Sequence, residues 1–246
     1  MIQNNSRLNL CLFFLMAIFA ADGSVSSEEK TGRLQKLQSS LIVGLISQNE
    51  KPNTRHETFP ASYDRQRQAS VFVFAMQLTR EDVHAVHALL SIKDDERYAA
   101  SFATPFGITH FSVRGLAMLI VKRMTLLDQH VTPQWLVRRA WPFERARAWL
   151  EETQFESLAD LQTKSIEKQI QLLKELQFVD GIRQNRYTPS LSVEEFDNLR
   201  TQILKELDAI RLQLRESGKP ILPESLDSEE ELFWGLPWSP RETPWG

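Results

Sequence analysis

Residues 192–217 carry the most constraining pattern in this chain, a run of apolar residues that recur every three or four positions with charged flanks. The run consists of Phe196, Leu199, Ile203, Leu207, Ile210 and Leu214. Such spacing lines one side of an α-helix. Ser192 with Glu195 forms a capping box at its start, and Gly218 with Pro220 stops it. The segment therefore predicts a long helix with one narrow apolar seam.

A second long helix is predicted directly before the first. Ser157 with Asp160 opens it, Gly181 is its expected end, and a broad apolar stripe lies between them. Two long helices joined by a loop of moderate length pack as an antiparallel hairpin. The sequence thus predicts a mainly α, multi-helix protein with a long antiparallel helical hairpin near its C-terminus.

The earlier segments mostly predict further helices. They are residues 28–47, 65–78, 79–93 and 112–124, with two short helices within 133–153 that Pro142 separates. Thr79 with Asp82 resembles a capping box, and the apolar run Val71–Phe74 is also compatible with a strand. Residues 98–111, which contain the turn signal Pro105-Phe106-Gly107, are compatible with one small β-hairpin.

Residues 1–23 are typical of an export signal, because Arg7 precedes an apolar run from Leu10 to Ala21 and small residues follow it. A membrane span needs about 20 apolar residues, so the run is short for one, and a retained anchor helix is the alternative. The only cysteine, Cys11, lies inside this run. Removal of the signal would exclude disulfides and cysteine chemistry. We therefore expect a periplasmic or secreted protein.

The rest of the chain predicts a helical domain at residues 24–218 and an acidic tail, rich in proline and tryptophan, at residues 219–246. The whole chain has a formal net charge of −3. The tail alone holds six acidic residues against two basic ones, so the remainder is close to neutral. A neutral body gives no electrostatic reason to expect nucleic-acid binding.

Polar residues gather near the centre of the chain, where two histidines three residues apart share a helix face and an acidic turn follows. Such a pair can bind one metal ion, and nearby acids can add ligands. The candidate metal ligands are His84, His87, Asp94 and Asp95. With the Asp94–Glu96 carboxylates, they define the alternative of a metal-dependent or other hydrolase. A solvated structural turn is the simpler interpretation, since a calcium loop would need more ligands and a glycine.

No complete catalytic or cofactor motif accompanies these residues. His110 would face Tyr98 or the acids across the expected hairpin, where a hydrogen-bonded structural histidine is the commoner outcome. Ser101 and Ser112 lack the nucleophile-elbow pattern of serine hydrolases. The sequence thus assigns no catalytic residue and no cofactor.

Arginines and tryptophans alternate between Trp135 and Leu150. Arginine forks bind carboxylates or phosphates, and indoles stack on sugars or lie at membrane surfaces. The candidate ligand-binding residues, for a protein partner or an anionic glycan or lipid surface, are Trp135, Arg138, Arg139 and Arg145. The alternative is a helix with core-facing aromatic residues and a solvated arginine face. The acidic tail could also dock on this basic region.

Several short motifs run through the middle third of the chain. They are Leu89-Leu90, Asp94-Asp95-Glu96-Arg97-Tyr98, Phe111-Ser112-Val113-Arg114-Gly115, Trp149-Leu150, Ser157-Leu158 and Leu161-Gln162. They resemble motifs of uncharacterised exported bacterial proteins, and this resemblance implies no activity, substrate or ligand.

The sequence therefore favours an exported, non-catalytic binding or structural protein over an enzyme. Its partner would contact the Trp-Arg region, the apolar seam or the tail. The seam could instead face a second copy of the chain, which would form a homodimer through Phe196, Ile203 and Ile210.

Overall fold

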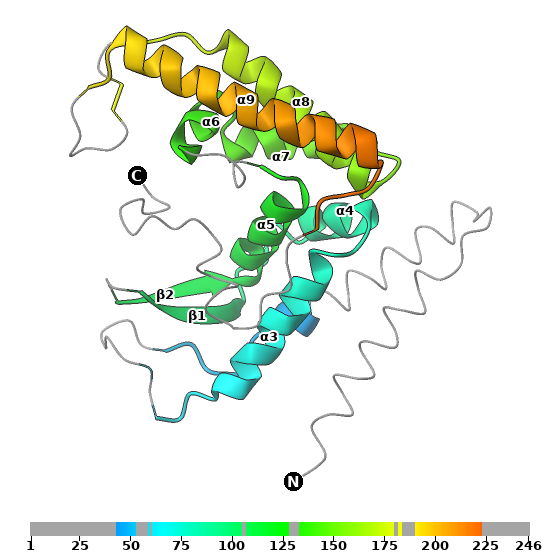
Figure 1. Ribbon diagram of the computed structural model, residues 1–246. Coiled ribbons are helices and arrows are strands. Elements are labelled where there is room, and N and C mark those ends of the chain that lie inside the picture. Colours follow the sequence, from blue (N-terminus) through cyan, green and yellow to red (C-terminus); the bar gives the residue numbers. More distant parts are fainter. Residues whose placement is uncertain are drawn as a thin grey trace. The chain divides into compact units, whose positions relative to one another are not determined.

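The computed structural model describes residues 43–52, 59, 61–104, 107–127, 133–179, 182–183 and 190–222. The predicted export signal and residues 223–246 of the tail lie outside these ranges. The described elements are α3 (Arg65–Leu78), α4 (Val83–Ser91), β1 (Tyr98–Thr104), β2 (Gly107–Ser112), α5 (Val113–Met124), α6 (Gln134–Ala140), α7 (Phe143–Glu152), α8 (Leu158–Glu175) and α9 (Val193–Ser217) (Figure 1). The mainly α prediction is confirmed. Over the same ranges, no helix combines the length and the apolar character that crossing a membrane requires.

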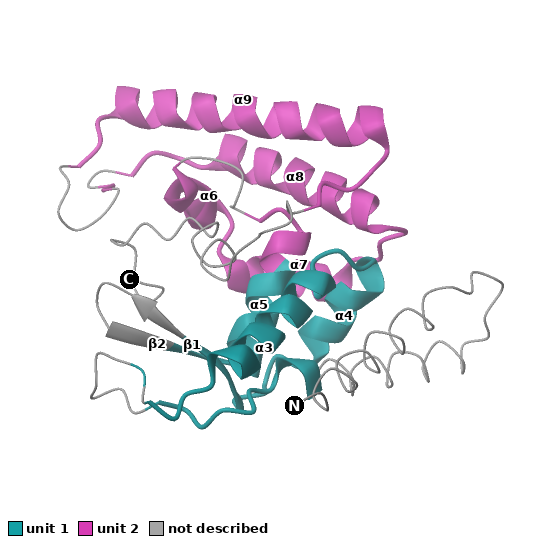
Figure 2. Cartoon of the chain, turned by 60° about the horizontal axis from the view of Figure 1, so that its bottom comes forward, with its two compact units in different colours: residues 1–121 teal, residues 122–246 magenta. Residues whose placement is uncertain are grey.

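The chain divides into two compact units, residues 1–121 and 122–246, which Figure 2 shows in different colours. The division falls inside α5, and the domain predicted at residues 24–218 extends over both units. Each unit buries its own set of apolar side chains.

In the first unit, α3 begins at Asp64, whose carboxylate accepts hydrogen bonds from backbone N–H groups of the first turn. The helix ends at Thr79, whose hydroxyl donates back to the carbonyl of Met76 at 2.7 Å. The predicted capping role of Thr79 for the next helix is therefore wrong. Asp82 caps α4 instead, because it accepts from the backbone N–H of Val83 at 2.6 Å. The strand alternative for residues 71–74 is also wrong, since they lie inside α3.

The small predicted hairpin is confirmed as β1 and β2, which pair antiparallel with Ser101 opposite His110. A bulge interrupts the register between Tyr98 and Ala100. Successive residues of a regular strand face opposite sides, so a bulge changes the side on which the preceding residue lies. It brings Tyr98 to the side of Ser101. The hairpin packs on α3, and Ser112 then caps α5 by accepting from a backbone N–H one turn into the helix.

In the second unit, α8 and α9 pack side by side as the predicted antiparallel hairpin (Figure 2). The capping box of Ser192 and Glu195 is present at the start of α9. α8 ends at Glu175 and not at the predicted Gly181. It stops early because Leu176 turns toward the core and its carbonyl accepts from Nη1 of Arg200 at 2.9 Å.

The apolar seam of α9 lies in the core of this unit. Phe196 and Ile203 are both 0% exposed and pack in one cluster with apolar residues of α8. These two side chains are therefore unavailable to a second copy of the chain. Of the three residues predicted for a homodimer, only Ile210 keeps partial exposure. Homodimer formation itself stays a prediction.

Buried glutamines on α8 donate hydrogen bonds to backbone carbonyls at the end of α5 and just after it. Gln162 donates to the carbonyl of Met124 at 2.9 Å, and Gln169 donates to the carbonyl of Leu126 at 3.1 Å. The last carbonyls of a helix have no partner within the helix itself. Leu126 also has a positive φ of 54°, which turns the chain sharply there. The two amides therefore satisfy the backbone at a tight turn.

Candidate functional site

Two acidic residues of the central turn, Asp95 and Glu96, are held in local ion pairs. The carboxylate of Asp95 accepts from the backbone N–H and from Nε of Arg97 at 3.1 and 2.9 Å, and from Nη2 at 2.5 Å. Hydrogen bonding to Arg97 lowers the pKa of Asp95. Glu96 pairs with Arg114 at 2.6 Å. This arrangement matches the interpretation of the segment as a structural turn.

The predicted metal ligands do not form a larger cluster. Asp94 and His84 are exposed, whereas His87 is half-buried. Burial, followed by the nearby His84, lowers the pKa of His87. Across the described ranges, no group of three or more histidine, cysteine, aspartate or glutamate side chains lies together where a metal ion could bind. Metal binding by the two histidines alone stays a prediction.

The first unit contains a different polar site, a chain of hydrogen bonds that sequence reasoning missed. The hydroxyl of Tyr63 contacts Gln68 and lies 2.7 Å from that of Tyr98. The hydroxyl of Tyr98 lies 2.7 Å from Oγ of Ser101, which lies 2.6 Å from Nδ1 of His110. We call these five side chains the relay. It links the segment before α3, α3 itself and both strands of the hairpin.

The donor and the acceptor of each hydrogen bond in the relay follow from groups that can only donate or only accept. The backbone N–H of Ser101 donates to Oε1 of Gln68 at 3.2 Å, which identifies that atom as the amide oxygen. Tyr63 must therefore donate its single proton to the same oxygen. Tyr98 then donates to Tyr63, and Ser101 donates to Tyr98, because each hydroxyl has one proton. The last donor is the Nδ1–H of His110, which bonds to Ser101.

This direction is the reverse of the one that a nucleophilic serine needs. In a serine hydrolase, a histidine nitrogen accepts the proton of the serine hydroxyl. Here Ser101 accepts from His110 and gives its own proton to Tyr98. Ser101 is also 0% exposed, so its oxygen is closed to a substrate. His110 is hydrogen-bonded, as expected for a structural histidine.

The relay ends at His110, whose Nε2 is buried and has no hydrogen-bond partner among the residues that the structure describes. Because Nδ1 carries the proton, Nε2 holds the lone pair of the neutral ring. Burial, and next the positive charge of Lys51, lower the pKa of His110 and favour that neutral form. Burial also raises the pKa values of Tyr63 and Tyr98, so both phenols stay protonated.

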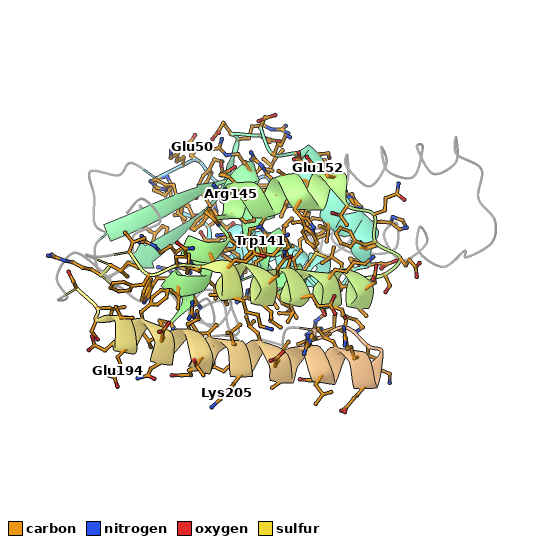
Figure 3. The ribbon with its side chains drawn as sticks, turned by 90° about the horizontal axis from the view of Figure 1, so that it is seen from above. Glu50, Trp141, Arg145, Glu152, Glu194 and Lys205 are labelled. Carbon is orange, nitrogen blue, oxygen red and sulfur yellow. The ribbon has the colours of Figure 1, made fainter. Side chains whose placement is uncertain are left out.

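The second unit offers an exposed site on α7. The ring of Trp149 meets those of Trp141 and Phe155 edge to face, at centroid distances of 5.2 and 5.3 Å. Trp141 is buried, whereas Trp149 and Phe155 are half-buried. The ammonium group of Lys164 lies 5.6 Å from the centre of the Phe155 ring. Arg145, which Figure 3 labels on α7, lies four residues before Trp149, and this spacing places both residues on one face of the helix. We call Arg145, Trp149, Phe155 and Lys164 the Trp149 surface.

The four predicted ligand-binding residues divide between core and surface. Trp135 packs against the apolar core of its unit. Arg138 donates to Gln134 one turn earlier in α6. Arg139 and Arg145 are exposed, and neither forms an ion pair with any residue that the structure describes. The sequence signal that could have identified the Trp149 surface is the four-residue spacing of Arg145 and Trp149.

Comparisons of the chain with known protein families, with curated proteins and with solved structures found no match. The structure defines a mainly α protein of two compact units, one with a partly buried polar relay and one with a half-exposed aromatic surface beside Arg145. These two sites are the candidates for a functional role.

Proposed function

We propose that this chain is an exported, non-catalytic protein that binds a partner rich in carboxylate or phosphate groups through the Trp149 surface. The observation that carries the proposal is Arg145, an exposed cation without an ion-pair partner among the described residues, one turn from a half-exposed indole. A guanidinium group binds carboxylate or phosphate through two parallel hydrogen bonds. An indole adds a large contact area at low entropic cost.

Four other arginines of the second unit form ion pairs, which are Arg147–Glu144, Arg200–Asp197, Arg211–Asp208 and Arg215–Glu167. The exposed Arg139 forms none with a described residue, but Trp135, one turn away on its helix, packs against the apolar core. An arginine that keeps its charge unmatched next to a half-exposed aromatic ring has the composition of a binding hot spot. The Trp149 surface is therefore the best-supported binding site of this unit.

The first unit supports the non-catalytic part of the proposal. Ser101 is enclosed and donates away from His110, and Asp95 is occupied by Arg97. These groups hold the hairpin and the central turn in place. Export itself rests on the pattern of residues 1–23. Fractionation of cells that express the chain with and without these residues would test it, and equal distribution of the two forms would contradict it.

The binding test compares Arg145→Ala with Arg211→Ala, which removes the same charge from a paired arginine on α9. Heparin oligosaccharides and vesicles that contain an anionic lipid are titrated separately against each protein. Arg145→Ala should weaken binding by about tenfold, the effect of about 1.4 kcal/mol. Arg211→Ala should bind as the wild type does. Equal affinities of both variants, or no binding of either anion by the wild type, would overturn the proposal.

A further inference from the structure

The described chain is anchored firmly at the point where the acidic tail leaves it. The backbone N–H of Ile221 donates to Oε1 of Gln162 at 2.8 Å. Nε2 of Gln162 donates in turn to the carbonyl of Ile221 at 3.0 Å and to that of Met124 at 2.9 Å. Gln162 is 1% exposed. One buried amide therefore pairs with both backbone groups of Ile221, as a neighbouring strand would, and fixes the start of the tail on α8.

This anchor lies close to the Trp149 surface within the same unit. Gln162 and Lys164 are two residues apart on α8, which is about 3 Å along the helix axis. Lys164 lies over the ring of Phe155, and that ring contacts Trp149. The start of the tail is therefore held on the turn of α8 that also carries Lys164, the residue in contact with the half-exposed ring of Phe155.

The residues that follow the anchor carry acidic side chains, whose charge is opposite to that of Arg145, and further tryptophans. Between residues 223 and 246, one basic residue, Arg241, stands against six acidic ones. The acidic residues are Glu224, Asp227, Glu229, Glu230, Glu231 and Glu242. The same segment holds the tryptophans Trp234, Trp238 and Trp245. Five of its acids lie within residues 224–231, and an extended chain of this length reaches about 30 Å from the anchor.

We propose that residues 223–246 dock on the Trp149 surface of their own chain, with the acids of 224–231 against Arg145 and the tryptophans against the exposed rings. The inference rests on the proposed function, because it assigns a second ligand to the same surface. A tethered segment acts at an effective concentration of about 1 mM, so even a weak contact is well populated. The tail is therefore a built-in competitor that an external anion displaces.

The test measures docking directly, in the full chain and without any external anion. A nitroxide spin label is attached through Ser228→Cys in a chain that also carries Cys11→Ser, so that a single thiol reacts. We expect the label to broaden the indole N–H signal of Trp149 in NMR spectra. Trp135 on α6, whose indole nitrogen is buried, is the internal reference. An unbroadened Trp149 signal overturns the inference.

Charge reversal then separates specific docking from random encounters of the tail. Arg145→Glu should remove the broadening, and so should a tail that carries Glu229→Lys, Glu230→Lys and Glu231→Lys. Combining both sets of changes should restore it, because opposite charges again face each other. Failure of the combined variant to recover overturns the inference. The spin-label measurement needs no heparin or lipid, so it is independent of the binding test. If the tail docks but the protein binds neither anion, the proposed function is rejected and the docking inference stands.

Discussion

The two units bury polar side chains in opposite ways. In the first unit, the relay runs in one direction from His110 to Gln68, and its hydroxyls both accept and donate. In the second unit, Gln162 and Gln169 each donate directly to a backbone carbonyl at the end of α5. The relay is a series of bonds in which each donor needs the next acceptor. The hydrogen bonds of the two glutamines are independent, so losing one leaves the other in place.

This difference shows two solutions to one problem, which is that a buried polar group without a partner costs about 1–3 kcal/mol. A series arrangement fixes one geometry across several elements, because no member can turn without breaking its neighbour's bond. Independent bonds repair separate defects, such as the unpaired carbonyls at a helix end. The relay should therefore respond as a unit to substitution, and the two glutamines should respond locally.

The largest effect is expected from Gln162→Leu. The substitution removes the donor of two backbone carbonyls and the acceptor of the Ile221 N–H. We expect a loss of about 3 kcal/mol of stability in the second unit. Hydrogen exchange, read separately over residues 1–121 and 122–246, should show the loss only in the latter range. Gln171→Leu, on the exposed side of α8, is the matched control and should change stability by less than about 0.5 kcal/mol. Equal effects of the two variants would contradict the role assigned to Gln162.

Ser101→Ala should have the next largest effect, because it interrupts the relay in the middle. It leaves the Nδ1–H of His110 without its acceptor and removes the donor to Tyr98. We expect a loss of about 2 kcal/mol in the first unit. Ser70→Ala on α3, which removes only a bond to the carbonyl one turn earlier, should cost less than about 0.5 kcal/mol. Hydrogen exchange of the β1 amides distinguishes the two, and an unchanged β1 in Ser101→Ala would sink this assignment.

The sequence predicted what local rules control. Pro142 separates two short helices, Ser192 and Glu195 form the capping box, and the seam from Phe196 marks the long hairpin, because each depends on neighbours within a few residues. Thr79 failed as a cap because its hydroxyl had a nearer acceptor in the preceding turn. Short-range patterns cannot decide between such competing local bonds.

The polar sites could not be predicted for a different reason. Tyr98 reaches Ser101 only because a bulge shifts the register of β1, and no residue pattern marks that bulge. Gln162 bonds to backbone groups 38 and 59 residues away, which its position among apolar residues does not reveal. Arg145 was predicted as a ligand-binding residue from the alternation of arginines and tryptophans in this segment. Its exposure and unmatched charge emerged only from the three-dimensional structure.

A smaller effect is the energetic coupling between two substitutions, which tests whether the relay bonds depend on one another while the glutamine bonds do not. Ser101→Ala and Tyr63→Phe remove the two donors on either side of Tyr98 in the relay, so their combined cost should differ from the sum by about 1 kcal/mol. Gln162→Leu and Gln169→Leu lie seven residues apart on α8, about 10 Å along its axis, and should add within about 0.5 kcal/mol. Two double-mutant cycles measured by urea unfolding give both values. Additive costs in the relay would show that its bonds act separately.

The smallest expected effect is on the pH dependence of stability in the first unit. The pKa of His110 is lowered in the folded chain, so the unfolded chain binds a proton first as the pH falls. The stability from the neutral ring is therefore fully present above about pH 6.5 and is lost as the pH falls through the lowered folded value. His110→Asn keeps an N–H that can donate to Ser101 and removes the titrating nitrogen.

Subtracting the stability of His110→Asn from that of the wild type isolates this term at each pH. His87, whose folded pKa is lowered in the same direction, contributes equally to both proteins and cancels. Asp95 and Glu195, whose pKa values are also lowered, cancel in the same way. The difference, measured by urea unfolding from about pH 7.5 to about pH 5.5, should decrease steadily with acidification. If the difference does not change over this range, Nε2 of His110 gains a proton as easily in the folded chain as in the unfolded one. The relay would then end at a solvated nitrogen and not at a buried acceptor.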